Sequence, residues 1–171
     1  IEPITDGPFA GLKSLTQRIN IFSEARDQAD HSGAVIVSAK AQAIPIFQFG
    51  VFYDKDLEIT NGPPMYFDGW VPSNSNIYLS SNNSYYRHVV TTPGDLIHDR
   101  KDKHDIKNGV HIANDAGTDV QLTFDSRSHP LDSDFQARSH SDFNDRVRTG
   151  AYGVDTLKLP LPGGMSPHEI I

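Results

Sequence analysis

Residues 65–79, "MYFDGWVPSNSNIYL", match residues 84–98, "SYYRHVVTTPGDLIH", when the two segments are aligned with an offset of 19 residues. The alignment places Phe67 on Tyr86, Val71 on Val90, Asn76 on Asp95 and Ile77 on Leu96. In a β-solenoid each rung stacks its apolar side chains on the same positions of the next rung, so a sequence repeat near this length is expected of stacked rungs. We therefore predict that the segments are successive rungs, paired as parallel, in-register strands. A hairpin closed by "SSNNS" (80–84) would make the pairing antiparallel instead.

Short apolar segments recur between turn signals from Leu57 to Phe124. The apolar segments are "LEI", "MYF", "IYL", "HVV", "DLI", "VHI" and "VQLTF", and the turn signals include "NGPP", "SNSN", "SNNS" and "TTPG". Short strands with no helical pattern between them are typical of an all-β protein. The repeat favours a β-solenoid, a coil like a parallel β-helix, over the alternative of a β-sandwich or jelly roll.

The N-terminal part of the chain carries the most apolar strands. Residues 15–25 alternate loosely between apolar and polar side chains, which predicts a half-buried strand, and the polar residues 26–33 fit a hairpin connection. Residues 34–53 are the most apolar stretch, and Pro45 excludes an unbroken helix there. We expect two strands broken near Pro45, at least one of them central in its sheet. The side chains expected to be mostly buried are Phe47, Phe49, Val51 and Phe52.

These patterns divide the chain into three regions. Residues 1–53 supply N-terminal strands that pack on the body, 54–124 form the solenoid-like body, and 125–171 form a polar excursion and an extended C-terminal tail. Within the excursion we expect one helical turn around 141–148. Because the sequence begins at Ile1 without Met, we expect a piece of a longer chain, or a mature form whose targeting segment is gone.

Composition excludes several classes of function. The formal net charge is −7, which argues against nucleic acid or an anionic membrane surface as a partner. The chain has no cysteine, so a disulfide framework, thiol catalysis and a thiolate zinc site are excluded. No apolar run approaches the roughly 18 residues that a membrane helix needs, so we expect no direct membrane insertion in this segment.

Histidine and aspartate offer two weak candidate metal sites. His98, His104 and His111 lie near carboxylates, but their spacing matches no zinc motif, and the mixed-charge residues 98–108 are better explained as a solvated loop between rungs. In a strand, His111 would point to solvent, opposite to its neighbours. Calcium prefers oxygen ligands, and the candidates for it are Asp132, Asp134, Asp142 and Asp145. These residues lack the glycine and late glutamate of an EF-hand, so we expect no cofactor and leave calcium open.

Aromatic and amide side chains between 66 and 86 suggest a carbohydrate surface, because exposed rings beside amides can stack on sugars. The candidates are Trp70, Tyr78, Asn74 and Asn76, near Tyr66, Tyr85, Tyr86, Asn82 and Asn83. Core filling is the more frequent fate of an aromatic residue. Asp54, Asp56 and Glu58 share one strand face, where three acids are explained more simply by solubility than by polysaccharide cleavage. No G-x-S-x-G elbow is present, and nothing singles out a catalytic triad.

Four segments of the chain carry a resemblance to known proteins: "GPFAGL" (7–12), "IPIFQFGVFYDKDLEI" (44–59), "GPPMYFDGWVPSNSNIYL" (62–79) and "GAYGVDTLKLPLPGGMSPHEII" (150–171). Together they resemble a group of exported bacterial proteins found with type IV pilus assembly genes, which often begin with a PilX-like, prepilin-type segment. The resemblance implies an exported, surface-associated protein with a repetitive β body, and it supplies no catalytic residues. In that group a valine after the "GPP" is followed by a histidine, a small residue and Asn-Gly. Here Val71 is followed by "PSNS" (72–75), so no role of that histidine or glycine transfers.

Two functions remain open from the sequence. The first, which we favour, is a non-catalytic structural or adhesive module of an exported, surface- or pilus-associated bacterial protein, located in the periplasm, on the cell surface or outside the cell. Its expected partners are other surface or pilus proteins, or further copies of itself. The alternative is a carbohydrate-binding or polysaccharide-cleaving β-helix module.

Overall fold

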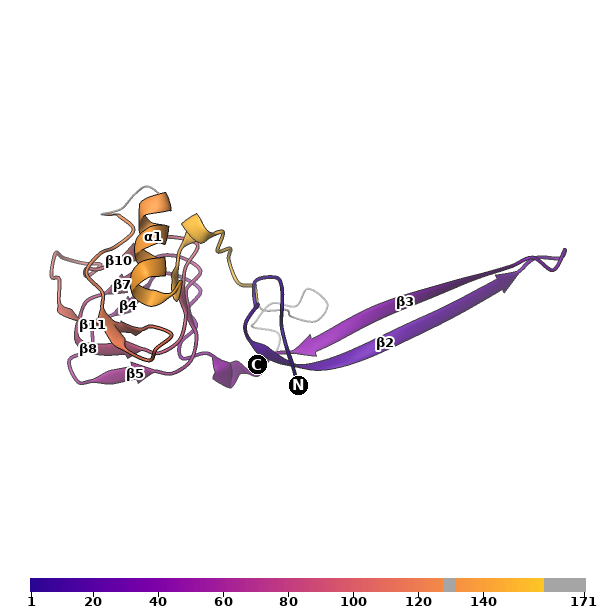
Figure 1. Cartoon of the computed structure of the whole chain (residues 1–171), viewed down its shortest axis with the longest axis horizontal. Coiled ribbons are helices and arrows are strands. Elements are labelled where there is room, and N and C mark those ends of the chain that lie inside the picture. The colour runs from indigo at the N-terminus through magenta and orange to yellow at the C-terminus, as the bar shows by residue number, and fades with distance from the viewer. Residues whose placement is uncertain (128–131, 159–171) are drawn as a thin grey trace. The chain divides into compact units, whose positions relative to one another are not determined.

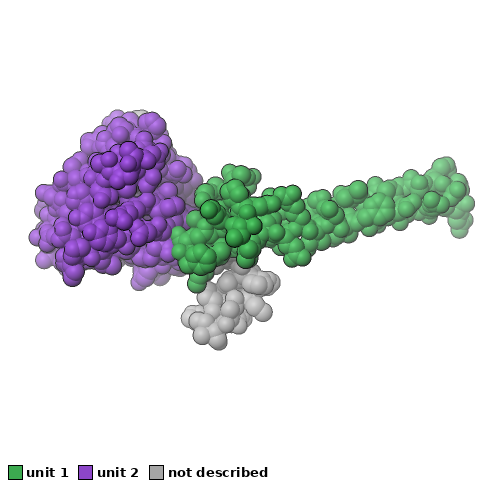
Figure 2. All heavy atoms as spheres, turned by 60° about the horizontal axis from the view of Figure 1, so that its bottom comes forward, with its two compact units in different colours: residues 1–48 green, residues 49–171 purple. Residues whose placement is uncertain are grey.

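The computed structural model describes residues 1–127 and 132–158, and it divides the chain into two compact units (Figures 1 and 2). Unit 1 is Ile1–Gln48 and unit 2 is Phe49–Ile171. The sequence suggested boundaries after residues 53 and 124, whereas the structure keeps the described residues from 125 onward in unit 2. Strands make up 42% and helices 11% of the chain, so the protein is β-rich and all-β in character.

Unit 1 contains a long antiparallel hairpin. Strands β2 (Lys13–Arg26) and β3 (Ser32–Ala43) pair in continuous register, and β1 (Glu2–Pro3) pairs only with the start of β2. The predicted hairpin connection is confirmed. Its loop is closed by Asp27, whose carboxylate accepts the backbone N–H groups of Ala29 and His31 at 2.8 and 2.9 Å, as short acidic side chains commonly do in turns.

The expected burial of this region is wrong. β3 pairs with β2 alone and is exposed along its whole length, so it is not a central strand. Beyond Pro45 the chain forms a short 3-10 helix, η1 (Ile46–Gln48), and then makes only isolated bridges, and the Phe47 side chain is 83% exposed. Phe49, Val51 and Phe52 are only partly buried. A proline removes one ladder donor and fixes its own backbone angle, which explains why the strand stops here.

Unit 2 is built from three sheets whose strands recur in a fixed order along the chain (Figure 1). The first sheet holds β4 (Leu57–Ile59), β7 (Ile77–Leu79) and β10 (Leu96–Ile97). The second holds β5 (Met65–Phe67), β8 (Ser81–Tyr86), β11 (Asn108–Ala113) and β12 (Asp119–Gln121). The third holds β6 (Val71–Pro72), β9 (Val90–Thr91) and β13 (Val147–Arg148). Every named pair in these sheets is parallel except β11 with β12.

The predicted parallel register of the two matching segments is confirmed. Ile77 pairs with Leu96 and Val71 pairs with Val90, with no antiparallel pairing across 80–84. Leu57 pairs with Ile77 in the same way, so three strands carry an aliphatic residue at this equivalent position. These side chains are all buried in one core, because parallel, in-register strands place equivalent positions on the same face.

Polar side chains join neighbouring strands at one corner of unit 2. The Asp56 carboxylate accepts the N–H of Asn76 at 3.1 Å, and the Asn76 side chain accepts the N–H of Asp95 at 2.9 Å. Asn76 and Asp95, which the sequence alignment superposes, thus occupy equivalent corners, and the Asp95 carboxylate accepts the Ser126 hydroxyl at 2.7 Å. Neither Asn76 nor Asp95 has a positive φ. A Cβ on Gly94 would lie 2.5 Å from the Asn76 Oδ1 atom and 3.2 Å from the Asn76 backbone nitrogen, so a larger residue here would displace the Asn76 side chain.

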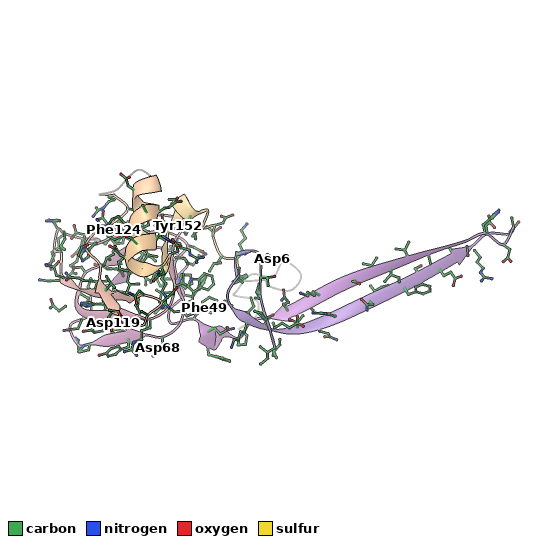
Figure 3. The ribbon with its side chains drawn as sticks, viewed as in Figure 1. Asp6, Phe49, Asp68, Asp119, Phe124 and Tyr152 are labelled. Atoms are coloured by element: carbon green, nitrogen blue, oxygen red, sulfur yellow. The ribbon has the colours of Figure 1, made fainter. Side chains whose placement is uncertain are left out.

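Residues 132–143 form one helix, α1 (Asp132–Phe143), where the sequence suggested only a turn around 141–148. Phe135 and Phe143 are buried on one face of α1, with ring centroids 5.6 and 5.7 Å from that of Phe124. Phe124 and Tyr152 both lie beside α1 in Figure 3, and Tyr152 is the last residue of a short 3-10 helix, η2 (Gly150–Tyr152). The extended tail expected after residue 158 lies outside the described residues.

Candidate functional site

The mixed-charge residues 98–107, here called the charged loop, are organised by one buried carboxylate. Asp99 is buried and accepts the backbone N–H groups of Arg100 and Asp105 at 2.8 and 2.7 Å. The Nδ1 atom of His104 lies 2.7 Å from its other oxygen. Burial by itself would raise the pKa of Asp99, but the Asp105 amide, the His104 ring and the Arg100 amide together lower it to about 2. The predicted mixed-charge loop is confirmed: residues 101–104 are exposed, and the buried Asp99 holds the loop through its hydrogen bonds.

Cations of the charged loop reach two of the acids that the sequence offered for polysaccharide cleavage. The Lys101 Nζ atom lies 2.9 Å from an Asp56 carboxylate oxygen, and the Arg100 guanidinium lies 3.6 Å from Glu58. The hydroxyl of Ser75 and then Lys101 lower the pKa of Asp56. A cleaving pair of acids needs one carboxyl group of raised pKa as its general acid, and Asp56, whose pKa is lowered, does not supply it.

The three histidines proposed as zinc ligands have separate partners. His98 is buried, and its Nε2 atom lies 3.0 Å from the carbonyl oxygen of Lys107, while His104 bonds Asp99 as described. His111 lies on the outer face of β11, as expected, with its ring stacked on Tyr85 at 5.1 Å. Among the described residues, no group of three or more histidines and acids is placed to hold a metal ion.

The acids proposed for calcium also engage separate partners. Asp142 lies 3.4 Å from Arg138, and Asp145 lies 2.8 Å from the His140 ring. Asp134 is exposed on α1, and the side chain of Asp132 lies outside the described residues. The hydrogen bond from His140 is the main cause of a lowered pKa at Asp145, and Asp145 in turn raises the pKa of His140.

The sugar-binding candidates are engaged in holding unit 2 together. Trp70 is buried, stacks on Phe49 at 5.3 Å and donates its indole N–H to Thr91 at 2.8 Å. Asn74 bonds both the N–H and the carbonyl oxygen of Leu157, at 2.7 and 2.8 Å. Asn76 belongs to the corner described above. Tyr78 is half-buried on β7.

The second sheet carries an outer aromatic strip. The sequence pointed to Tyr66 and Tyr85 as aromatic candidates, but their stacking with His111 was missed. Tyr66, Tyr85 and His111 are in register on β5, β8 and β11, and their rings stack at 4.8 and 5.1 Å. Each ring covers a face of its neighbour, so the strip presents ring edges rather than a flat sugar platform. The Arg87 guanidinium lies 4.9 Å from the Tyr66 ring centre. The sequence signal that could have revealed this strip is a ring-bearing residue followed by a core residue on each of the three strands, "YF" (66–67), "YY" (85–86) and "HI" (111–112).

Seven of the exposed large hydrophobic side chains of the described residues lie on the long hairpin. Cross-strand partners in β2 and β3 share the same parity, so odd-numbered residues form one face of the ribbon and even-numbered residues the other. The odd face consists of Leu15, Gln17, Ile19, Ile21, Ser23 and Ala25 on β2, and Gly33, Val35, Val37, Ala39, Ala41 and Ala43 on β3. It carries no charged residue, and its large side chains are exposed: Ile21 by 57% and Val35 by 61%.

The even face of the long hairpin is polar. It carries Arg18, Glu24, Arg26 and Lys40, with Phe22 beside Ile36 as its one large apolar pair. Figure 3 shows side chains standing away from both faces of β2 and β3. A two-stranded ribbon without further packing is marginally stable in water, and a contiguous exposed apolar face usually marks an interaction surface. We therefore treat the odd face as the candidate functional surface of unit 1.

Comparisons of the chain with protein-family models, curated proteins and solved structures find no match. In the described part of the chain, no helix is long and apolar enough to cross a membrane.

Proposed function

We propose that the chain is a non-catalytic structural or adhesive module of an exported, surface- or pilus-associated bacterial protein. In this proposal unit 2 is a short β-solenoid that serves as a rigid body, and the long hairpin of unit 1 is its attachment element. The observation that carries the proposal is the recurrence of parallel, in-register strands in three sheets, with the same corner repeated at Asp56, Asn76 and Asp95. Its exported location rests on the sequence resemblance to pilus-associated proteins.

The contacts that polar residues make within unit 2 support a structural role. Asp99 holds the charged loop, Asn74 and Asn76 join segments distant in sequence, and Trp70 fills the interior. Each of these groups is committed to a contact within unit 2, which suits a rigid spacer or docking surface. Solenoids gain stability from contacts between neighbouring rungs, so such polar ladders reinforce the body.

The test compares two variants of the full-length protein in the bacterium that produces it. Ile77→Asp places a charge in the core and should abolish surface display and adhesion or piliation. A double variant, Glu58→Gln with His104→Gln, removes titratable groups from the surface and should leave both unchanged. Protease treatment of intact cells should reach the wild-type protein. Loss of function in the double variant, with thermal stability of the purified protein unchanged, would overturn the non-catalytic role.

The second candidate is a carbohydrate-binding module. The stacked rings of the outer aromatic strip offer no flat platform, but Tyr66 at one end of the strip is 55% exposed, beside Arg87, and this exposed ring is the observation in its favour. Calorimetric titration with bacterial and host polysaccharides tests it, with Tyr66→Ala as the variant and Tyr53→Ala, another exposed tyrosine, as its matched control. Binding that is lost only in Tyr66→Ala would establish the carbohydrate function in place of the structural one.

A further inference from the structure

We propose that the odd face of the long hairpin binds the odd face of a second copy of this chain, forming a reversible dimer with the two hairpins parallel. The proposal concerns unit 1 alone. A monomeric protein would therefore overturn it and leave the role proposed for unit 2 standing.

The first argument is charge. The odd face has no charged residue over the whole paired length of β2 and β3, so two identical faces can meet with no like charges opposed. All the charged side chains of the 12 cross-strand pairs, including Arg18 and Lys40, lie on the even face and stay in water when the odd face is covered. Lys13 shares the parity of the odd face but lies beyond these pairs, where it pairs with Pro3 of β1.

The second argument is shape. On the odd face, β2 carries large side chains at Leu15 and Ile19, while their cross-strand partners on β3, Ala43 and Ala39, are small. The face therefore has a ridge along β2 and a groove along β3 over the half nearer β1. Facing layers pack best when large side chains meet small ones.

This asymmetry selects one orientation of the pair. A twofold axis parallel to the strands places β2 of each copy over β3 of the other, at the same level. Each residue then faces, in the second copy, the residue that it pairs with in its own: Ile19 meets Ala39, and Ile21 meets Val37. A twofold axis across the strands would instead oppose ridge to ridge and groove to groove. The parallel arrangement is thus the one that fills the groove.

The third argument is area. The ribbon has 12 cross-strand pairs. With a rise of about 3.4 Å per residue and strands about 4.8 Å apart, the face measures roughly 40 by 10 Å, or about 800 Å² for the two copies together. Stable interfaces bury about 1,200–2,000 Å², so this contact suits a reversible dimer with a dissociation constant on the order of micromolar.

The experiment is sedimentation of the full chain over a concentration series from below to far above the micromolar range. Wild type should pass from monomer to dimer. Ile21→Asp and Val37→Lys should each weaken the dimer at least about tenfold, because each buries an unpaired charge. The matched control is Asn20→Asp, which adds the same charge to the even face and should leave the dimer unchanged. Fluorescence of Trp70 checks that unit 2 remains folded in every variant.

A mixture of the two weakened variants separates a lost interface from a lost hairpin. In the parallel dimer, position 21 of one copy faces position 37 of the other, so an equimolar mixture of Ile21→Asp and Val37→Lys should regain dimer through an aspartate–lysine pair. A wild type that stays monomeric, a control as weak as Ile21→Asp, or a mixture no stronger than its components would each overturn the proposal.

Orientation is tested by a spin label at the hairpin tip. The chain has no cysteine, so Gln28→Cys gives one labelling site in the loop between β2 and β3. Parallel hairpins place the two labels within about 20 Å, since stacked sheets lie about 10 Å apart. Antiparallel hairpins would separate them by about the length of the ribbon, roughly 40 Å, and that distance would contradict the parallel arrangement.

Discussion

Ile77 stands at the centre of the first sheet, and its truncation should cost unit 2 much of its stability. The side chain is 0% exposed and pairs with Leu57 on one side and Leu96 on the other. Ile77→Ala removes three carbon atoms, which at about 0.8 kcal/mol per buried CH₂ is about 2.4 kcal/mol of lost transfer free energy. The cavity that remains between two fixed strands adds to this, so we expect a total of about 3–5 kcal/mol.

Urea unfolding followed by Trp70 fluorescence measures this loss, since Trp70 is buried within the same unit. The matched control is Ile21→Ala on the long hairpin, studied at concentrations where the chain is monomeric. Ile21 is already 57% exposed, so its truncation should change the free energy of unfolding by no more than about 0.5 kcal/mol. A loss below about 1 kcal/mol for Ile77→Ala, or equal losses for the two variants, would refute the stacked core.

Three further outcomes are expected. Gly94→Ala should lower the unfolding midpoint, because its Cβ would lie 2.5 Å from the Asn76 Oδ1 atom, and adding Asn76→Ala should recover part of the loss in a double-mutant cycle. Asp145 raises the pKa of His140 above 6.5, so their pair stabilises the fold below that pH and is lost as pH rises through the raised value. His140→Gln should therefore lower the thermal midpoint at pH 5–6 and leave it unchanged at pH 9. Asp99→Asn removes the anchor of the charged loop and should speed its cleavage by trypsin, measured by mass spectrometry, whereas unchanged cleavage would contradict that anchoring role.

The parallel register could be predicted because a repeat leaves a signal that does not depend on local propensity. Val71 and Val90, or Ile77 and Leu96, need only recur at the right distance to reveal stacked positions. The carboxamide of Asn76 could likewise be assigned to a turn. Its actual partner, the N–H of Asp95 in the next corner, became clear only when the two corners were placed side by side.

Burial in unit 1 could not be predicted, because alternation along a strand does not say what covers the apolar face. The alternation around Ile19 and Ile21 is the same whether that face is covered by the chain itself or lies open. The helix α1 was missed since its buried face is supplied mainly by Phe135 and Phe143, two full turns apart in a polar sequence. The exposure of the charged loop could be predicted from its composition, but the burial of Asp99 could not, because nothing in the sequence separates it from the neighbouring acids.

Stacking of the strands in unit 2 is tested most directly by methyl–methyl nuclear Overhauser effects in a sample with labelled Ile, Leu and Val side chains. The parallel register predicts cross-peaks from Ile77 to both Leu57 and Leu96, and from Val71 to Val90, because these residues are in-register neighbours on parallel strands. Absence of these cross-peaks, with backbone contacts between residues 79 and 85 that mark an antiparallel hairpin across 80–84, would contradict it.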